Sequence, residues 1–280
     1  MNQIYRWLGT SKQNVHQRLN KEIDKNAEIG QMQMVIRQVR EDHPEMGSKA
    51  LFRRIKPKTM GRDKFIEFYG NYGFKIVPRK SFRRTTDSSG VIRFPNLIQG
   101  RELTSVNQVL VSDITYYEMN QKFYYLTFIM DLFSRRIIGY HASKRLRTVD
   151  TTIPALKMAM ERINQVSGEK PILHSDGGGQ YYSKEFLSLT AGKLRNSMCK
   201  NVYENPHAER VNGIIKNSYL RGYNPATFQE LTRHLKKAVY MYNNEKPHSA
   251  LNYLAPQEFE EKLKQKNKCN NQLLKTVNPI

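Results

Sequence analysis

The chain has 280 residues, 46 Lys and Arg against 25 Asp and Glu, and a formal net charge of +21. Its length favours more than one compact unit, and its charge favours an anionic partner, nucleic acid before an acidic membrane surface. Two cysteines, no apolar run as long as a membrane span and no apolar secretory signal exclude secreted, disulfide-rich and integral membrane proteins, so an intracellular nucleic-acid-binding protein is predicted.

The first 76 residues have a helical pattern. A Gly-Thr-Ser sequence ending at Ser11 predicts a helix stop followed by an N-cap, and the next helix is expected over residues 12–39. Shorter amphipathic stretches open at Ser48 and cover residues 64–72. Two short helices joined by a tight turn are typical of a helix-turn-helix, although many helical hairpins share this spacing. Residues 1–76 are therefore predicted to be a helix-turn-helix-like DNA-binding region.

The positive charge is concentrated in residues 48–101, which hold 14 Lys or Arg against 3 Asp or Glu, a net charge of +11. Residues 77–104 show little periodicity, which predicts an extended basic linker arm. A solvated linker is one interpretation, but the density and single sign of the charge favour an arm that follows DNA phosphates. The candidate phosphate contacts in this arm are Arg79, Lys80, Arg83 and Arg84.

The pattern changes in residues 105–222, which alternate between strand and helix. Three successive β-type segments with tight joints predict an antiparallel meander over 109–118, 123–131 and 136–143. The elements expected next are a helix over 150–164, a strand over 171–176, a helix from Ser183 to about 194, an apolar strand near Met198 and a helix over 205–219. The order βββαβαβα predicts an α/β fold with a mixed five-stranded sheet, and residues 223–280 are expected to form C-terminal helices and a tail.

Three carboxylates stand out by position. Asp113 lies within a strand, where a charge is costly unless it is paired, exposed or bound to a metal ion. Asp176 ends a later strand, where open α/β sheets place functional groups, and Glu209 lies on the helix that follows. Three oxygen donors without Cys or clustered His suit Mg²⁺ or Mn²⁺. Taken singly, each carboxylate is better explained as a solvated residue, so the residues alone leave both interpretations open.

Five sequence blocks resemble one known family. They are Val111-Ser-Asp-Ile-Thr-Tyr116, His174-Ser-Asp-Gly-Gly-Gly-Gln-Tyr-Tyr-Ser183, Asn205-Pro-His-Ala-Glu-Arg-Val-Asn-Gly-Ile-Ile-Lys216, Tyr242-Asn-Asn-Glu-Lys-Pro-His-Ser-Ala-Leu251 and Pro256-Gln-Glu-Phe259. Together they resemble the transposases of the bacterial insertion-sequence family numbered three, of the OrfB type. These proteins are relatives of retroviral integrases, with a ribonuclease-H-like catalytic core and a DDE triad. The segment that begins at His43 also resembles the small helical domain preceding that core.

The resemblance implies a site and an activity. Asp113, Asp176 and Glu209 fall on the three triad positions, which implies two bound Mg²⁺ or Mn²⁺ ions. The implied activity is a DNA transposase that cleaves 3′ ends and transfers strands in a metal-dependent reaction. Two other interpretations stay open, namely a transposase-derived DNA-binding protein without catalysis and a ribonuclease-H-like nuclease.

The chain departs from the family pattern in two places. Leu110 stands where the family usually has a Trp shortly before the first Asp, and a packing change is expected there. The 32 residues between Asp176 and Glu209 are fewer than in the usual family gap, which makes Glu204 a rival third ligand. Glu209 is preferred because the block that contains it aligns on it.

Other residues of the blocks have weaker roles. Lys216 follows Glu209 by two helical turns on the same face, and it is expected either to contact a phosphate or to be a solvated helix lysine. Arg210 and Asn205 carry the same pair of interpretations. His174 is expected to orient Asp176 or to be a structural residue of a buried strand.

Asp131 matches the family too and is interpreted as a turn-former at the end of a strand. The partners implied by the resemblance are insertion-sequence ends and target DNA, further copies of the chain on that DNA, and an upstream-frame protein or fusion, with no membrane partner. The implied location is the bacterial cytoplasm, in association with the nucleoid.

Overall fold

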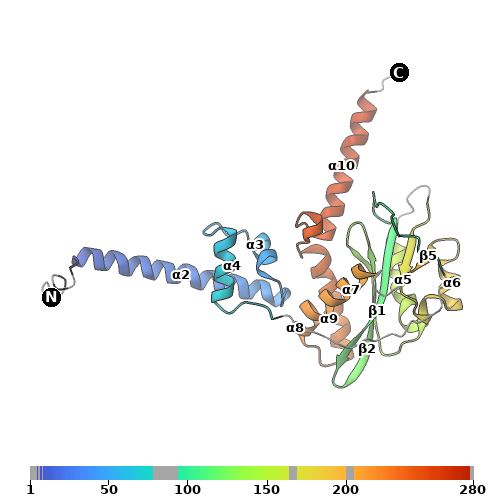
Figure 1. The fold of residues 1–280 in the computed structure, drawn as a ribbon, viewed down its shortest axis with the longest axis horizontal. Coiled ribbons are helices and arrows are strands. Elements are labelled where there is room, and N and C mark those ends of the chain that lie inside the picture. The colour runs from blue at the N-terminus through green and yellow to red at the C-terminus, as the bar shows by residue number, and fades with distance from the viewer. Residues whose placement is uncertain are drawn as a thin grey trace. The chain divides into compact units, whose positions relative to one another are not determined.

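The computed structural model describes residues 9–77, 94–163, 169–199 and 205–277, together with Tyr5 and Trp7, and the side chains as far as residue 266 (Figure 1). The chain divides into two compact units, Met1–Ile76 and Val77–Ile280. No helix in the described part of the chain is both long enough and apolar enough to span a membrane.

The first unit holds the helices α2 (Lys12–Asp42), α3 (Ser48–Ile55) and α4 (Arg62–Asn71) in its described residues 9–76. The predicted N-cap is confirmed, because Ser11 Oγ accepts a hydrogen bond from the Asn14 backbone N–H at 3.1 Å. Six residues separate α3 from α4, a longer connection than a tight turn. The helix-turn-helix assignment therefore stays a prediction.

A small apolar core holds the first unit together at the C-terminal end of α2. Ile36, Leu51 and Phe65 are fully buried at its centre. Arg40 closes this core, because its Nη2 donates to the Phe74 carbonyl at 2.6 Å. The part of α2 that precedes residue 29 is almost entirely exposed.

The second unit is built on a mixed five-stranded sheet of strand order β3-β2-β1-β4-β5. Its strands are β1 (Val109–Met119), β2 (Lys122–Asp131), β3 (Ile137–Ser143), β4 (Ile172–Ser175) and β5 (Arg195–Met198). The first three strands are paired antiparallel, whereas β4 pairs parallel with both β1 and β5. This arrangement confirms the predicted ribonuclease-H-like fold class.

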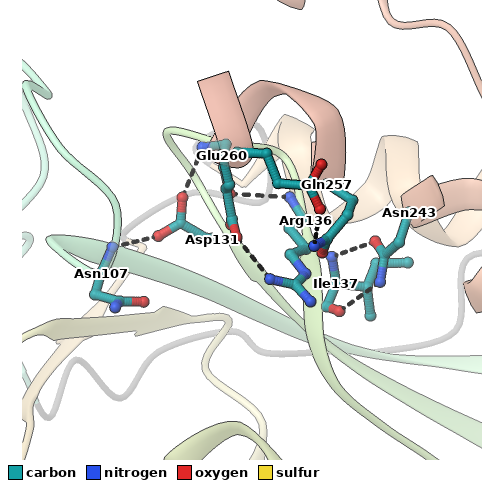
Figure 2. A network of polar contacts seen from close by, with 9 residues as sticks. Asn107, Asp131, Arg136, Ile137, Asn243, Gln257 and Glu260 are labelled. Carbon is teal, nitrogen blue, oxygen red and sulfur yellow. Dashed lines mark hydrogen bonds and ion pairs between the residues drawn. The ribbon is translucent and has the colours of Figure 1, made fainter. Parts of the chain in front are cut away.

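The turns of the meander follow from local residues. Asn120 and Gln121 both have positive φ, as the tight turn of a twisted hairpin requires. Asp131 was predicted to be a turn-former, which is confirmed: Oδ1 accepts the Ser134 N–H at 2.6 Å, and Oδ2 accepts the Asn107 N–H at 2.6 Å (Figure 2). Asp131 therefore fixes both the β2–β3 turn and the segment that leads into β1.

Helices cover both faces of the sheet (Figure 1). One face is covered by α5 (Thr152–Arg162) and α6 (Lys184–Thr190), and the other by α7 (Pro206–Gly213), the π-helix η4 (Ile214–Leu220), α8 (Arg221–Tyr223) and α9 (Phe228–Asn244). Successive residues of a strand point to opposite faces, so Leu110 packs in the first layer and Val111 in the second. By the same alternation, Asp113 faces α7.

Two helix predictions are corrected. The helix expected to reach residue 194 ends at Thr190, because Gly192 adopts a positive φ of 73° and Leu194 leads into β5. The single helix expected over 205–219 is an α-helix only as far as Gly213 and continues as the π-helix.

Packing of β3 against α5 requires a glycine at position 139. A Cβ on Gly139 would lie 2.2 Å from the Ala155 carbonyl oxygen of α5.

The C-terminal helices α9 and α10 (Pro256–Val277) are fastened to the start of β3 (Figure 2). Asn243 Oδ1 accepts the Ile137 N–H at 2.9 Å and its Nδ2 donates to the Ile137 carbonyl at 2.8 Å. The Arg136 Nη1 donates to the Glu260 Oε2 at 2.6 Å. The side-chain amide thus pairs with the strand as another backbone would.

Asn243→Ala is expected to lower the free energy of unfolding by about 2–4 kcal/mol, because it leaves two buried backbone groups of Ile137 unpaired. The matched control is Asn244→Ala, since Asn244 is exposed and bonds only within its own helix. Urea denaturation measures both variants. Equal losses in the two variants would contradict the role of Asn243.

Candidate active site

The register of β1 and β4 brings two of the predicted carboxylates together. Ser112 of β1 is paired with Ser175 of β4 in the parallel ladder. The residues that follow these two serines, Asp113 and Asp176, are therefore brought side by side. Both side chains are half-buried, and they lie where β4 ends beside the middle of β1. The predicted convergence of these two strands is therefore what the structure shows.

The electrostatics of Asp113 reflect this crowding. Burial, and after it the charges of Asp176 and Glu209, raise the pKa of Asp113 to about 8, against the opposing hydrogen bonds. Those bonds come from the Ile114 N–H to Oδ1 at 2.9 Å and from Asn212 Nδ2 to Oδ2 at 2.6 Å. Burial also raises the pKa of Asp176, although the Gly178 N–H donates to its Oδ1. Two like charges in a desolvated place favour proton uptake or a bound cation.

Helix α7 brings Glu209 to the same region. Pro206 occupies the first turn, where its fixed φ favours a helix start, and Glu209 follows where the helix dipole favours negative charge. Its side chain is exposed, and its charge acts on Asp113. In the part of the chain that the structure describes, no three His, Cys, Asp or Glu side chains are arranged as a metal cage. Asp113 and Asp176 thus lie together, and the exposed Glu209 side chain lies near enough for its charge to act on Asp113.

Polar side chains pin α7 and the π-helix to β1. Asn205 Nδ2 donates to the Ser112 carbonyl at 3.1 Å, and Lys216 Nζ donates to Thr115 Oγ1 at 2.6 Å and to the Tyr116 carbonyl at 3.2 Å. Lys216 is half-buried, so its interpretation as a solvated lysine is wrong. Burial lowers the pKa of Lys216, and the Asp113 charge opposes this shift.

Asn205 is buried, and its Oδ1 has no hydrogen-bond partner among the described residues. Asn205 was expected to contact a phosphate or to be solvated. The structure instead buries its side chain between the start of α7 and β1, where it bonds to Ser112. His174 Nδ1 is bonded to Ser197 Oγ at 2.9 Å on β5, which supports its structural interpretation. Arg79, Lys80, Arg83, Arg84 and the rival Glu204 lie outside the described residues.

Sequence reasoning missed two residues of the site. Asn212 holds Asp113, and its spacing of three from Glu209 on one helix face was the available signal. Tyr181 is buried, and its hydroxyl lies 2.9 Å from Ser112 Oγ. Burial first, and then the charges of Asp176 and Asp113, raise the pKa of Tyr181, so the phenol stays neutral beside the acids.

The raised pKa of Asp113 predicts a pH-dependent stability. Between its ordinary value of 3.8 and about 8, the folded protein holds a proton that the unfolded chain has released. Metal-free protein should therefore lose stability as the pH rises through this window, by at most about 1.4 kcal/mol per pH unit. Asp113→Asn cannot titrate and should decline less.

Urea denaturation in EDTA at about pH 5 and about pH 8 measures this effect as the difference between the two proteins. The free energy of unfolding of Asp113→Asn, relative to that of the natural protein, should increase as the pH rises. A difference that is the same at both pH values would contradict the raised pKa.

The comparisons with known proteins agree with this fold. A family model described as Integrase core domain matches residues 104–200, and a second model with that description matches residues 193–256. The chain is 31% identical over 213 residues to the "Insertion element IS600 uncharacterized 31 kDa protein" of Shigella sonnei, which covers 74% of this chain and 77% of that protein. It is 31% identical over 165 residues to "Transposase InsF for insertion sequence IS3A" of Escherichia coli strain K12, which covers 56% of this chain and 54% of that protein.

One matching solved structure is the HTLV-2 integrase catalytic core domain in complex with magnesium, with a TM-score of 0.45, 22% identity, and coverage of 55% of this chain and 95% of that chain. The family models cover the sheet and α7, and the Shigella relative extends the match over most of both proteins. The chain therefore belongs to the insertion-sequence DNA transposases that carry an integrase core domain.

Proposed function

We propose that this transposase cuts DNA at the ends of an insertion sequence and joins the freed 3′ ends to target DNA, with Asp113, Asp176 and Glu209 as its metal-binding triad. One observation carries the proposal: Asp113 and Asp176 lie together where β4 ends beside the middle of β1, with a raised pKa at both. Two desolvated carboxylates that cannot both ionise at low cost are suited to cations, which can replace the proton and allow both to be charged.

The donor set fits magnesium or manganese. The carboxylates of Asp113, Asp176 and Glu209 offer only oxygen, which these hard ions prefer. The nearby Lys216 is held by Thr115 and the Tyr116 carbonyl, so it leaves the carboxylates to other cations. Two bound ions would lower the pKa of an attacking water or 3′-hydroxyl and neutralise the leaving oxygen.

The residues of this chain divide the work of holding the site. Asn212 orients Asp113, the Gly178 N–H orients Asp176, and the bonds of Asn205 and Lys216 keep α7 on β1. Glu209 is exposed in the first turn of α7, so its side chain is free to complete the triad when DNA and ions arrive.

The other interpretations are weaker on the same grounds. A DNA-binding derivative without catalysis would gain nothing from two desolvated acids side by side. A nuclease that cuts without joining shares the carboxylates, so only the reaction products distinguish it. The oligomer on DNA, the upstream-frame partner, the basic arm of residues 77–104 and the nucleoid location stay predictions that follow from the family.

Asp113→Asn and Glu209→Gln are expected to remove both cleavage and strand transfer, by about a thousandfold or more, because each removes one charged donor for the ions. The matched control is Glu161→Gln, since Glu161 is exposed on α5, on the opposite face of the sheet. The assay follows labelled insertion-sequence-end DNA with target DNA and Mg²⁺. Cleavage without joining by the natural protein would favour the nuclease, and full activity of Asp113→Asn would refute the triad.

Asn212→Ala is expected to lower strand transfer by about 10–100-fold, because the residue that orients a metal-binding carboxylate is lost. The matched control is Asn217→Ala, an exposed residue of the adjoining π-helix. A higher Mg²⁺ concentration should restore part of the activity if the defect lies in ion binding. Equal activity of the two variants would show that Asn212 does not position Asp113.

A further inference from the structure

A second cluster of charged side chains lies around Arg210, apart from the carboxylates. Its other members are Arg135 in the β2–β3 turn, and Lys246 and His248 in the segment that follows α9. The Arg210 charge acts on all three of these groups, and the Arg135 charge acts on His248 as well. We call these four residues the Arg210 cluster.

The Arg210 cluster has no acidic counterpart. In the described part of the chain, no carboxylate forms an ion pair with Arg135, Arg210 or Lys246. Asp131 acts on Arg135 from a distance, but its oxygens accept backbone N–H groups of the turn. Glu260 is paired with Arg136 instead.

Buried polar atoms of the cluster also lack partners. Arg135 Nη1 and His248 Nε2 are buried and make no hydrogen bond to any described residue. A buried guanidinium N–H without an acceptor is costly, and the half-buried Arg135 and Lys246 lie in the field of the exposed Arg210. The fold therefore keeps an arrangement that only an added acceptor or an anion would satisfy.

The electrostatics agree with this geometry. Burial and then the Arg210 charge lower the pKa of Lys246. Burial, followed by the charges of Lys246 and Arg210, lowers the pKa of His248 to about 3, so this imidazole is neutral at physiological pH. The cations of the cluster thus act against one another, and a bound anion would oppose these shifts.

The segment that carries Lys246 and His248 is held in place. The His248 ring meets the buried Tyr242 edge-on, with 4.7 Å between ring centroids. The His248 N–H donates to the Leu254 carbonyl at 3.1 Å, and the Tyr253 N–H donates to the His248 carbonyl at 2.8 Å. A site held this way is preorganised, which favours binding because little order is lost when a ligand arrives.

We propose that the Arg210 cluster binds a backbone phosphate of the DNA strand next to the phosphate that reacts at Asp113 and Asp176; this inference rests on the proposed function. Guanidinium groups bind phosphate oxygens through paired hydrogen bonds. Arg210 directly follows Glu209 on α7, so a DNA strand whose reacting phosphate lies at the carboxylates brings a nearby phosphate within reach of the cluster.

The test measures binding of duplex DNA by the full chain over a range of salt concentrations. Lys246→Gln and Arg135→Gln are expected to weaken binding about tenfold each and to lower the slope of log affinity against log salt by about 0.9. The matched control is Lys236→Gln, which removes an exposed lysine of α9 outside the cluster and should leave both values nearly unchanged.

A thermal melt without DNA excludes misfolding as the cause. Both cluster variants should melt no lower than the natural protein, because each removes a charge from a repulsive group. An unchanged DNA affinity and salt slope in both variants would overturn the proposal. A second result would also overturn it: inorganic phosphate raises the melting temperature of the natural protein only, while the natural protein and both variants bind DNA equally. The cluster would then bind small anions alone.

The strand-transfer assay separates this proposal from the proposed function. If Asp113→Asn keeps full activity while Lys246→Gln binds DNA more weakly, the triad is wrong and the phosphate site stands. If Asp113→Asn is inactive while both cluster variants bind DNA normally, the triad stands and the phosphate site is wrong.

Discussion

The parallel pairing of β1 with β4 places Asp113, in the middle of β1, beside Asp176, which directly follows the last residue of β4, and much of the second unit is arranged around that fact. Helices cover both faces of the sheet, so the two carboxylates lose much of their hydration. Like charges in such a place repel, and the fold compensates only in part, through hydrogen bonds from Asn212 and from backbone N–H groups. The repulsion that these hydrogen bonds leave uncompensated is what makes the site suited to cations.

The position of α7 depends on elements far from it in the sequence. Asn205, Asn212 and Lys216 attach α7 and the π-helix to β1. Apolar residues of α7 and the π-helix pack with α9 in one core on the same face of the sheet, and α9 is fastened to β3 by Asn243. A loosening of the C-terminal helices would therefore reach Glu209 through a continuous layer of packed side chains. The chain beyond the sheet is thus part of what shapes the site.

Much of this architecture was predictable because local patterns carry it. Alternating apolar residues and turn residues predicted the meander, and the position of Asp131 at a strand end predicted its role in the turn. The carboxylates were predictable because Asp113 is a charged residue within a strand, Asp176 follows a strand end and Glu209 lies near the start of a helix. The bond from Asn212 to Asp113 required the crossing of α7 over β1, which no local pattern encodes. The π-helix and the early end of α6 at Gly192 were missed for a related reason, since tertiary packing sets where a helix changes its winding or stops.

Charge is the property that the sequence described least accurately. The net charge of +21 suggests a uniform attraction to DNA, yet the described part of the second unit contains one group of crowded acids and one group of crowded bases. Asp113 and Asp176 repel each other at β1 and β4, and Arg210 on α7 repels Arg135 in the β2–β3 turn and Lys246 after α9. Each group is unfavourable alone, and each would be relieved by a component of the same ligand, cations for the acids and phosphates for the bases. A ligand that relieves such repulsion binds the folded chain and not the unfolded one, so it stabilises the fold as it binds. In this transposase, a lower stability of the free protein and a higher affinity for metal-loaded DNA therefore have one physical cause.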